Sequence, residues 1–163
     1  KEKVSREELG GAFTHASKSG VTHFTAANDV LVLRQIRELM QYIPQNCEEK
    51  APVYPYETGD EFRLDLRAIM PEKNTQPYEI KDVINAVLDE DSFMEVHEKY
   101  AENIVVGFGF LAGRSIGIVA NQPMHLAGVL DVDASKKAAR FVRFCDSFNI
   151  PLLVFEDVPG FLS

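Results

Sequence analysis

The stretch of sequence that decides the fold is residues 103–123, "NIVVGFGFLAGRSIGIVANQP". Apolar side chains alternate along its first half and again along its second half, with Ala112-Gly113 between the halves, a pattern typical of a β-hairpin. The alternating positions are Ile104, Val106, Phe108 and Phe110, then Ile116, Ile118 and Ala120. Gly107, Gly109 and Gly117 weaken the strands but permit close approach of another backbone. The stretch therefore predicts two antiparallel strands.

The residues that follow the hairpin predict a helix and then a parallel strand. Asp131 and Asp133 precede an expected helix over residues 134–148, since acidic residues suit the positive end of a helix. Its expected buried stripe is Ala138, Phe141, Val142, Cys145 and Phe148. After Pro151, the run "LLVFEDV" is typical of a strand that is covered on both faces. A strand, a helix and a strand imply a right-handed parallel connection.

The residues before the hairpin predict a short strand and three helices. The strand is "SFMEVH" at residues 92–97, and the helix before it has an apolar stripe from Ile80 to Leu88. A longer helix begins after Asn28 and ends before Pro44, since proline interrupts a helix. Its stripe is expected to face one core and consists of Val32, Ile36, Leu39, Met40 and Ile43. Near the N-terminus, Ser5-x-x-Glu8 has the form of a capping box, and Gly10-Gly11 limits that helix to one or two turns.

Residues 45–77 predict a boundary between two units. This segment is polar, contains four prolines and shows no sustained apolar period. Connections of this length are uncommon inside one compact domain. We therefore expect residues 1–44 to end a first unit, residues 45–78 to connect, and residues 79–163 to open a second unit.

The composition excludes several classes of function. A net charge of −8 and a pI near 5.0 argue against nucleic-acid binding, which requires a concentrated basic surface. No apolar run reaches the ~18 residues of a membrane-spanning helix, and the N-terminus has no signal-peptide pattern. Cys47 and Cys145 are far apart without CxxC spacing, which predicts free thiols in a reducing compartment. We expect a cytoplasmic or mitochondrial-matrix location and, since no Met begins the sequence, a piece of a longer chain.

Side-chain chemistry offers few candidates. The four histidines lack close ligand spacing, so no metal site is expected. His15 and Ser19 could form a Ser-His pair, but no nucleophile-elbow motif surrounds them and we interpret both as loop residues. Glu156-Asp157 follows the last strand, where burial could raise the pKa of a carboxyl group; a turn-capping role for Asp157 is the favoured interpretation. A basic set on the last helix could hold phosphate groups, although a solvated face is favoured: Lys136, Lys137, Arg140 and Arg143.

The turn Pro159-Gly160-Phe161 offers chemistry that needs no side chain. A tight turn at the end of a buried parallel strand can aim successive backbone N–H groups into one small volume. Glycine lets a ligand carbonyl approach closely. Donors placed in this way contribute about 3–4 kcal/mol to the stabilisation of an oxyanion transition state. The alternative, an ordinary turn without a ligand, stays open on spacing alone.

Four stretches resemble a known family, the carboxyltransferase subunits of biotin-dependent acyl-CoA carboxylases, of propionyl-CoA carboxylase beta and methylmalonyl-CoA decarboxylase alpha type. They are "EELGGAFTHASKSGV", "YAENIVVGFGFLAGRSIGIVANQP", "AGVLDVDASKKAARFVRFCDSFNIPLL" and "DVPGF". The resemblance runs from Val4 to Leu162 and is loose over residues 45–77. It implies an α/β crotonase-like fold, here the end of one domain and the first half of the next.

The resemblance also implies a function. The family moves a carboxyl group between carboxybiotin and the α-carbon of a short acyl-CoA, and its members are homo-oligomers, typically hexamers, that work with a biotin carboxylase or biotin carboxyl carrier partner. It implies that the amides of Gly160 and Phe161 are catalytic oxyanion donors and that Pro159 and Gly160 lie where biotin is handled. Two departures matter: Ser163 stands where the family continues with proline, and the family's other oxyanion turns have no match in this sequence.

Three alternatives remain open at this stage. A sodium-pumping decarboxylase would use the same chemistry in reverse. An ordinary crotonase such as a hydratase would need an acid/base pair, for which Glu156 is the only candidate. A non-catalytic assembly segment would use the amphipathic helices that begin near Asn28 and Ala134, since half a crotonase domain leaves a sheet edge and apolar faces uncovered.

Overall fold

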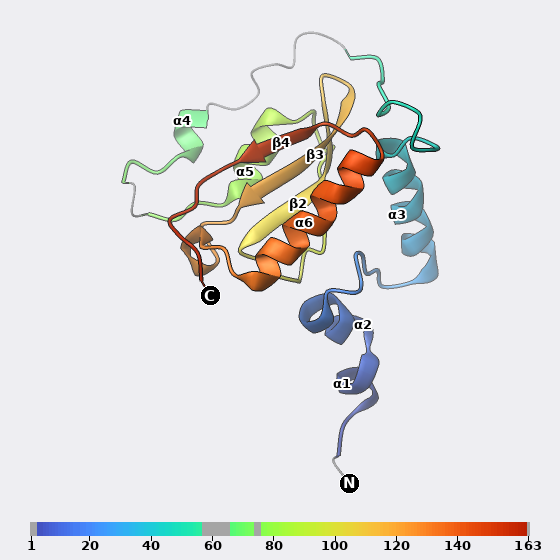
Figure 1. Cartoon of the computed structure of the whole chain (residues 1–163), viewed down its shortest axis with the longest axis vertical. Coiled ribbons are helices and arrows are strands. Elements are labelled where there is room, and N and C mark those ends of the chain that lie inside the picture. The colour runs from blue at the N-terminus through green and yellow to red at the C-terminus, as the bar shows by residue number, and fades with distance from the viewer. Residues whose placement is uncertain (1–2, 57–65, 74–75, 163) are drawn as a thin grey trace.

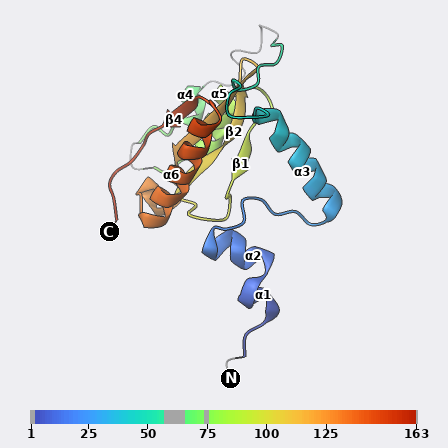
Figure 2. The same cartoon turned by 45° about the vertical axis from the view of Figure 1, so that its right-hand side comes forward.

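A computed structural model describes residues 3–56, 66–73 and 76–162. The described chain forms a four-stranded mixed sheet in the order β1-β2-β3-β4, with helix α6 across one face and α5 on the other face (Figure 1). Helix α3 lies on the side of β1 (Figure 2). The expected α/β organisation is therefore present. The elements are α1 (Arg6–Gly10), α2 (Ala12–Thr14), a π-helical turn (His15–Ser19), α3 (Asp29–Tyr42), α4 (Leu66–Ile69), α5 (Ile80–Val87), β1 (Met94–Val96), β2 (Ile104–Leu111), β3 (Arg114–Asn121), a 3-10 turn (Leu126–Gly128), α6 (Val132–Ser147) and β4 (Leu152–Phe155).

The predicted hairpin is confirmed as β2 and β3. The strands pair antiparallel from Ile104 opposite Asn121 to Leu111 opposite Arg114. The two-residue turn has positive φ at Ala112 (50°) and Gly113 (73°), the conformation that matches the right-handed twist of the strands. The Asp89 carboxylate accepts the N–H groups of Ala112 and Gly113 at 2.9 and 2.8 Å. A charged side chain from outside the hairpin thus fixes its turn.

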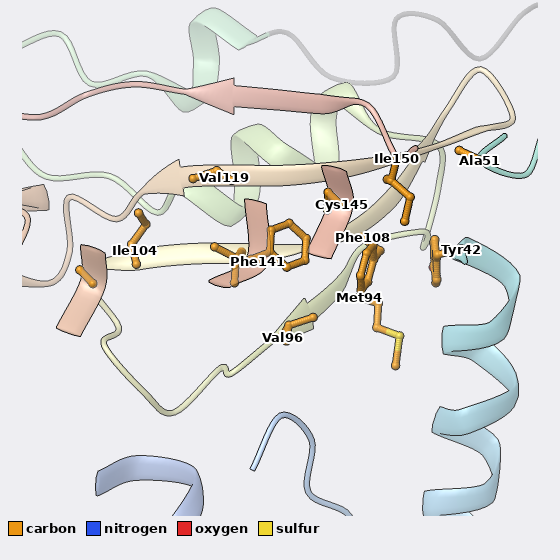
Figure 3. Close-up of a cluster of buried hydrophobic side chains, with 12 residues drawn as sticks. Tyr42, Ala51, Met94, Val96, Ile104, Phe108, Val119, Phe141, Cys145 and Ile150 are labelled. Carbon is orange, nitrogen blue, oxygen red and sulfur yellow. The ribbon is translucent and has the colours of Figure 1, made fainter. Parts of the chain in front are cut away.

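The two alternating apolar sets of the hairpin lie on opposite faces of the sheet. Val106 is opposite Val119, whereas Ile118 is opposite Gly107, so each strand contributes apolar side chains to both faces. One cluster lies under α6 and α3 and contains Tyr42, Met94, Val96, Ile104, Val106, Phe108, Val119, Phe141 and Cys145 (Figure 3). The other lies under α5 and contains Ile80, Ile84, Leu88, Val105, Ile116, Ile118 and Ala120. Burial on both sides explains why the hairpin is almost entirely apolar.

Two strand glycines let helices approach the sheet, as the sequence predicted. A Cβ added to Gly109 would lie 2.5 Å from Leu88 Cδ1, after α5. A Cβ added to Gly117 would lie 2.7 Å from Cys145 Sγ and 3.1 Å from Phe141 Cε1, both on α6. The glycines therefore weaken strand propensity but set the distance between the layers.

The step from β3 through α6 to β4 is confirmed, although β4 is less covered than expected. Asp131 caps α6, its carboxylate accepting the Ala134 N–H at 2.8 Å, and β4 pairs parallel with β3. Leu153 and Phe155 pack on the α5 side, whereas Val154 is 58% exposed. The expectation of cover on both faces is wrong for the described residues, because the face of β4 that carries Leu152 and Val154 is largely exposed.

The apolar stripe of α3 is also less buried than expected. The helix begins after Asn28, whose side chain accepts the Leu31 N–H at 3.1 Å. Leu39 and Ile43 pack against the core together with the fully buried Tyr42. The other stripe residues are exposed, namely Val32, Ile36 and Met40. Only the C-terminal end of α3 reaches the sheet, and Figure 2 shows the rest standing apart from α6.

Contacts cross the proposed boundary at residues 45–78, although that division stays a prediction. The Tyr42 hydroxyl donates to the Ser92 carbonyl and the Ser115 hydroxyl donates to the Tyr42 carbonyl, each at 2.7 Å. Val53 forms a single bridge with Arg114 beside the hairpin turn. Residues 57–65 and 74–75 of the expected connection lie outside the described residues. The capping box of α1 is present, with Ser5 and Glu8 bonded to each other's backbone N–H groups.

Candidate functional site

The turn predicted to bind an oxyanion lies just beyond the carboxyl end of β4. After Phe155 the chain leaves the sheet, and it pairs again at Phe161, which bridges in parallel to Leu130. The Leu130 N–H donates to the Gly160 carbonyl at 3.2 Å, and the Leu162 N–H donates to the Leu130 carbonyl at 2.8 Å. The position agrees with the general rule that open parallel sheets bind ligands outside the carboxyl ends of their strands.

The two candidate donors in this turn are not used by the described part of the protein. Within residues 3–56, 66–73 and 76–162, the N–H groups of Gly160 and Phe161 donate to no recorded acceptor. A Cβ placed on Gly160 would meet no atom within 4 Å, and the Phe161 side chain is 76% exposed. The turn thus combines free backbone donors with open space in front of Gly160, which is what a ligand oxygen requires.

The residues around the turn form a polar network at the ends of β3 and β4. The buried Asn121 at the end of β3 accepts the Asp157 N–H at 3.3 Å and donates to the Gly128 carbonyl at 3.1 Å. The Tyr78 hydroxyl donates to Asp157 Oδ2 at 3.0 Å. Burial, together with the neighbouring Asp157, raises the pKa of Tyr78 to about 12. This phenol therefore keeps its proton at neutral pH.

The acidic pair after β4 does not form the acid/base site that a hydratase would need. Glu156 is exposed, with no recorded side-chain partner among the described residues. The Asp157 carboxylate accepts from Tyr78 rather than from its own turn, so the favoured capping role is wrong and its contact is with a residue 79 positions away. Sequence alone could not reveal this pairing, because no local pattern links Tyr78 to Asp157.

The basic residues of α6 do not share one face. Lys137 is only 3% exposed, and its ammonium group donates to the carbonyls of Tyr100 and Ala101 at 2.7 and 3.3 Å. Burial lowers the pKa of Lys137 to about 8. The interpretation of Lys137 as part of a solvated face is therefore wrong. Lys136, Arg140 and Arg143 are exposed, as expected.

A second region with unusual chemistry surrounds two histidines whose rings are in contact and to which the sequence assigned no role. The rings of His23 and His97 lie 4.1 Å apart, and His97 Nε2 is buried without a partner among the described atoms. Burial, then the charges of neighbouring groups, lowers the pKa of His97 to about 4. Both rings line an apolar cavity of about 680 Å³ between α3, α6 and the sheet. None of the turn residues Pro159, Gly160 and Phe161 lines this cavity.

The other residues considered from the sequence do not form a functional site in the described part of the structure. His15 and Ser19 are hydrogen-bonded at 3.0 Å, but they sit in a π-helical turn rather than in a loop. Cys47 is exposed, Cys145 is buried and both are free. Within the described ranges, no three His, Cys, Asp or Glu side chains form a metal-ligand group. No helix in that part of the chain has the length and apolar character needed to span a membrane.

Comparisons with known proteins are consistent with one another. The model of the carboxyl transferase domain family matches residues 1–163. The carboxyltransferase subunit of propionyl-CoA carboxylase from Haloferax mediterranei is 55% identical over 162 residues, which cover 99% of this chain and 31% of that relative. The mitochondrial propionyl-CoA carboxylase beta chain of Homo sapiens is 48% identical over 99% of this chain and 30% of its own length.

The structural comparison supports the same fold. The transcarboxylase 12S structure, which describes a hexamer assembly with methylmalonyl-coenzyme A and methylmalonic acid bound, superposes with a TM-score of 0.94 at 44% identity, covering 99% of this chain and 31% of that chain. A single-chain, multi-domain long-chain acyl-CoA carboxylase shares the fold, with a TM-score of 0.81 at 23% identity. The predicted crotonase-like carboxyltransferase fold is therefore confirmed. The chain spans about 31% of the length of the propionyl-CoA carboxylase and transcarboxylase relatives and 16% of the multi-domain carboxylase.

Proposed function

Because this chain belongs to the carboxyl transferase domain family, we propose that it forms part of an acyl-CoA carboxyltransferase about three times its length. The proposed reaction moves a carboxyl group between biotin and the α-carbon of a short acyl-CoA. The names of the relatives support propionyl-CoA and methylmalonyl-CoA as the substrate class. The chemistry requires charge stabilisation more than proton transfer, because oxygen atoms of both reactants gain negative charge.

The observation that carries this proposal is the pair of free amides beyond β4. Gly160 and Phe161 present N–H groups without a described acceptor, and the space at Gly160 is open. Fixed backbone donors stabilise an oxyanion without reorganising during the reaction. We assign to Gly160 and Phe161 the oxyanion contact, and to Pro159 and Gly160 the surface that biotin approaches.

Biotin fits this site as a visiting group, held on a partner subunit or domain. When bound, it would supply or accept the carboxyl group. The chain's own contribution is to hold the two donors at the end of β4 and to leave the approach to Gly160 free of side chains. Glu156 has no part in this scheme, since it is exposed and no proton has to move through it.

The proposed assembly is a homo-oligomer that works with a biotin carboxylase or biotin carboxyl carrier partner. The exposed apolar side of α3 supports an oligomer or a further domain, because apolar faces of this size are normally covered. Its exposed members include Val30, Leu33, Ile36 and Met40. We propose a cytoplasmic or mitochondrial-matrix location, as for soluble carboxylases. The decarboxylase direction uses the same donors and is a second possibility for the same site.

The experiment uses a full-length carboxyltransferase that carries this sequence, assembled and assayed for carboxyl transfer. Phe161→Pro deletes one donor, whereas Phe161→Ala keeps the N–H and removes only an exposed ring. We expect Phe161→Pro to lower the rate by about 10²–10³-fold, the usual loss for one oxyanion donor, and Phe161→Ala to lower it far less. Equal rates for Phe161→Pro and Phe161→Ala would show that the Phe161 N–H group does not contribute to catalysis.

A second pair of variants separates this proposal from a hydratase. Gly160→Val places a branched side chain in the open approach, so we expect a loss of about 10²-fold or more, comparable to the loss of a donor. Glu156→Gln should leave carboxyl transfer nearly unchanged. A near-normal rate for Gly160→Val beside a collapsed rate for Glu156→Gln would favour acid/base catalysis by Glu156 and defeat the proposal.

A further inference from the structure

Among the described residues, the candidate turn is joined to the rest of the fold by one isolated bridge. Residues 160–162 are held by Leu130, which bonds to the Gly160 carbonyl at 3.2 Å and accepts the Leu162 N–H at 2.8 Å. These two backbone hydrogen bonds form a single bridge at the rim of the sheet. The direction of the Gly160 and Phe161 amides therefore depends on where the segment 128–130 lies.

The segment 128–130 is fixed in turn by buried asparagines. Asn121 donates to the Gly128 carbonyl at 3.1 Å, and Asn103 donates to the Val129 carbonyl at 2.8 Å. Asn121 is 7% exposed and Asn103 is 3% exposed. A Cβ on Gly128, which has a φ of 77°, would lie 3.0 Å from the Asp157 carbonyl oxygen. The segment therefore lies directly against the chain that leaves β4.

Asn121 contacts both sides of this arrangement. Its amide nitrogen holds Gly128, and its carbonyl oxygen accepts the Asp157 N–H at 3.3 Å. Tyr78 adds a second attachment to Asp157 through its hydroxyl, at 3.0 Å. Together they hold the start of the loop 157–162 and the segment 128–130, against which that loop ends. Neither side chain belongs to the turn that it holds.

We propose that Asn121 and Tyr78 are positioning residues for the oxyanion turn, an inference that rests on the proposed function. Oxyanion donors act only when they are held near the position of the developing charge, and a misplacement of about 1 Å can cost about 10²-fold in rate. The two hydrophobic clusters hold the ends of the strands in place. Asn121 and Tyr78 link the turn to these strand ends and thereby fix the direction of its two backbone N–H groups.

The kinetic test uses Tyr78→Phe and Asn121→Ala in the full-length, assembled carboxyltransferase. Tyr78→Phe keeps the ring and removes only the hydroxyl, so of the two variants it is the one that should disturb folding least. We expect kcat for carboxyl transfer to fall about 10-fold in Tyr78→Phe and by up to about 10²-fold in Asn121→Ala, with KM for the acyl-CoA little changed. The matched control is Tyr54→Phe, whose hydroxyl donates to the Gln41 carbonyl at 3.1 Å, away from the turn.

A structural measurement separates this inference from the proposed function. Amide hydrogen exchange at Leu162 reports its bond to Leu130 and needs no activity. We expect faster exchange at Leu162 in Tyr78→Phe and Asn121→Ala, with Val119 in the centre of the sheet unchanged. Absence of carboxyl transfer in the unmodified enzyme would overturn the proposed function. In an active enzyme, a normal kcat for both variants, or a lower kcat without faster exchange at Leu162, would overturn the positioning roles.

Discussion

The β2–β3 hairpin and helix α3 both have a regular apolar pattern in the sequence, but their side chains are buried to very different extents. Val106 and Ile118 in the hairpin are fully buried, whereas Ile36 in α3 is 49% exposed and Met40 is 56% exposed. In Figure 1, α6 lies in front of the hairpin and α5 lies behind it, whereas the apolar side of α3 packs against the core only near Tyr42. Periodicity therefore shows which side chains would gain from burial, and the partner surface decides whether they are buried.

Truncation at the centre of the hairpin tests the buried side of this comparison. Phe108 is 3% exposed, and its ring lies 5.1–5.9 Å from those of Tyr42, Phe141 and Phe144. Phe108→Ala should lower the free energy of unfolding by about 3–5 kcal/mol, because it leaves a cavity between layers. Urea unfolding of the Phe108→Ala variant and the unmodified protein would measure this loss of unfolding free energy. A loss no larger than that of the exposed control Phe161→Ala would show that the hairpin core is not tightly packed.

Addition of a methyl group tests the closeness of α6 to β3. Gly117→Ala would place a Cβ 2.7 Å from Cys145 Sγ, and overpacking of this kind costs about 1–3 kcal/mol. Cys145→Ala in the same chain should relieve part of the cost, so the double variant should be less destabilised than the sum of the single ones. Gly160→Ala is the control, since nothing lies within 4 Å of its Cβ. If the losses of unfolding free energy in the two single variants simply add in the double variant, the added methyl group does not press on Cys145.

Mild acid tests the junction between α3 and the sheet, with a smaller expected effect. The folded state depresses the pKa of His97 from 6.5 to about 4, mainly by burial, so the unfolded state binds the proton first as the pH falls. The stability held by neutral His97 is present above pH 6.5 and is lost as the pH falls toward 4. His23, Lys137 and Arg140 add to the depression.

Unfolding midpoints at pH 7 and pH 5 would measure this loss. His97→Asn should reduce the difference between the two midpoints, since asparagine tolerates the positive φ of 56° at this position and does not titrate. An equal pH dependence in His97→Asn and the unmodified protein would contradict the assignment.

The smallest expected effect lies on the exposed side of the comparison. Ile36→Ala should change the free energy of unfolding by no more than about 0.5 kcal/mol, as for other surface substitutions. A fully buried Ile36 would instead cost about 2–5 kcal/mol, the loss expected for Ile84→Ala in α5. A large loss at Ile36 in the 163-residue chain would mean that a partner surface covers α3 in solution.

Local patterns predicted most elements, because caps, turns and apolar alternation act over a few residues. The Asn28 and Asp131 caps, the Ala112-Gly113 turn and the order of strands around α6 all follow from such patterns. The inward direction of Lys137 could not be predicted, since its partners are carbonyls 36 and 37 positions away. For the same reason the sequence indicated the turn at Gly160 but gave no sign of Asn121 or Tyr78 as its supports.

The hydrogen bond from Tyr42 to Ser92 spans 50 positions. During synthesis, Tyr42 therefore emerges well before its partner Ser92. At about 5–20 residues per second, roughly 3–10 seconds pass between the emergence of α3 and that of the residue to which it anchors. A hairpin such as β2–β3 forms within about 1–10 μs once both strands are available. Helix α3 is thus synthesised several seconds before the residue that anchors its C-terminal end to the sheet.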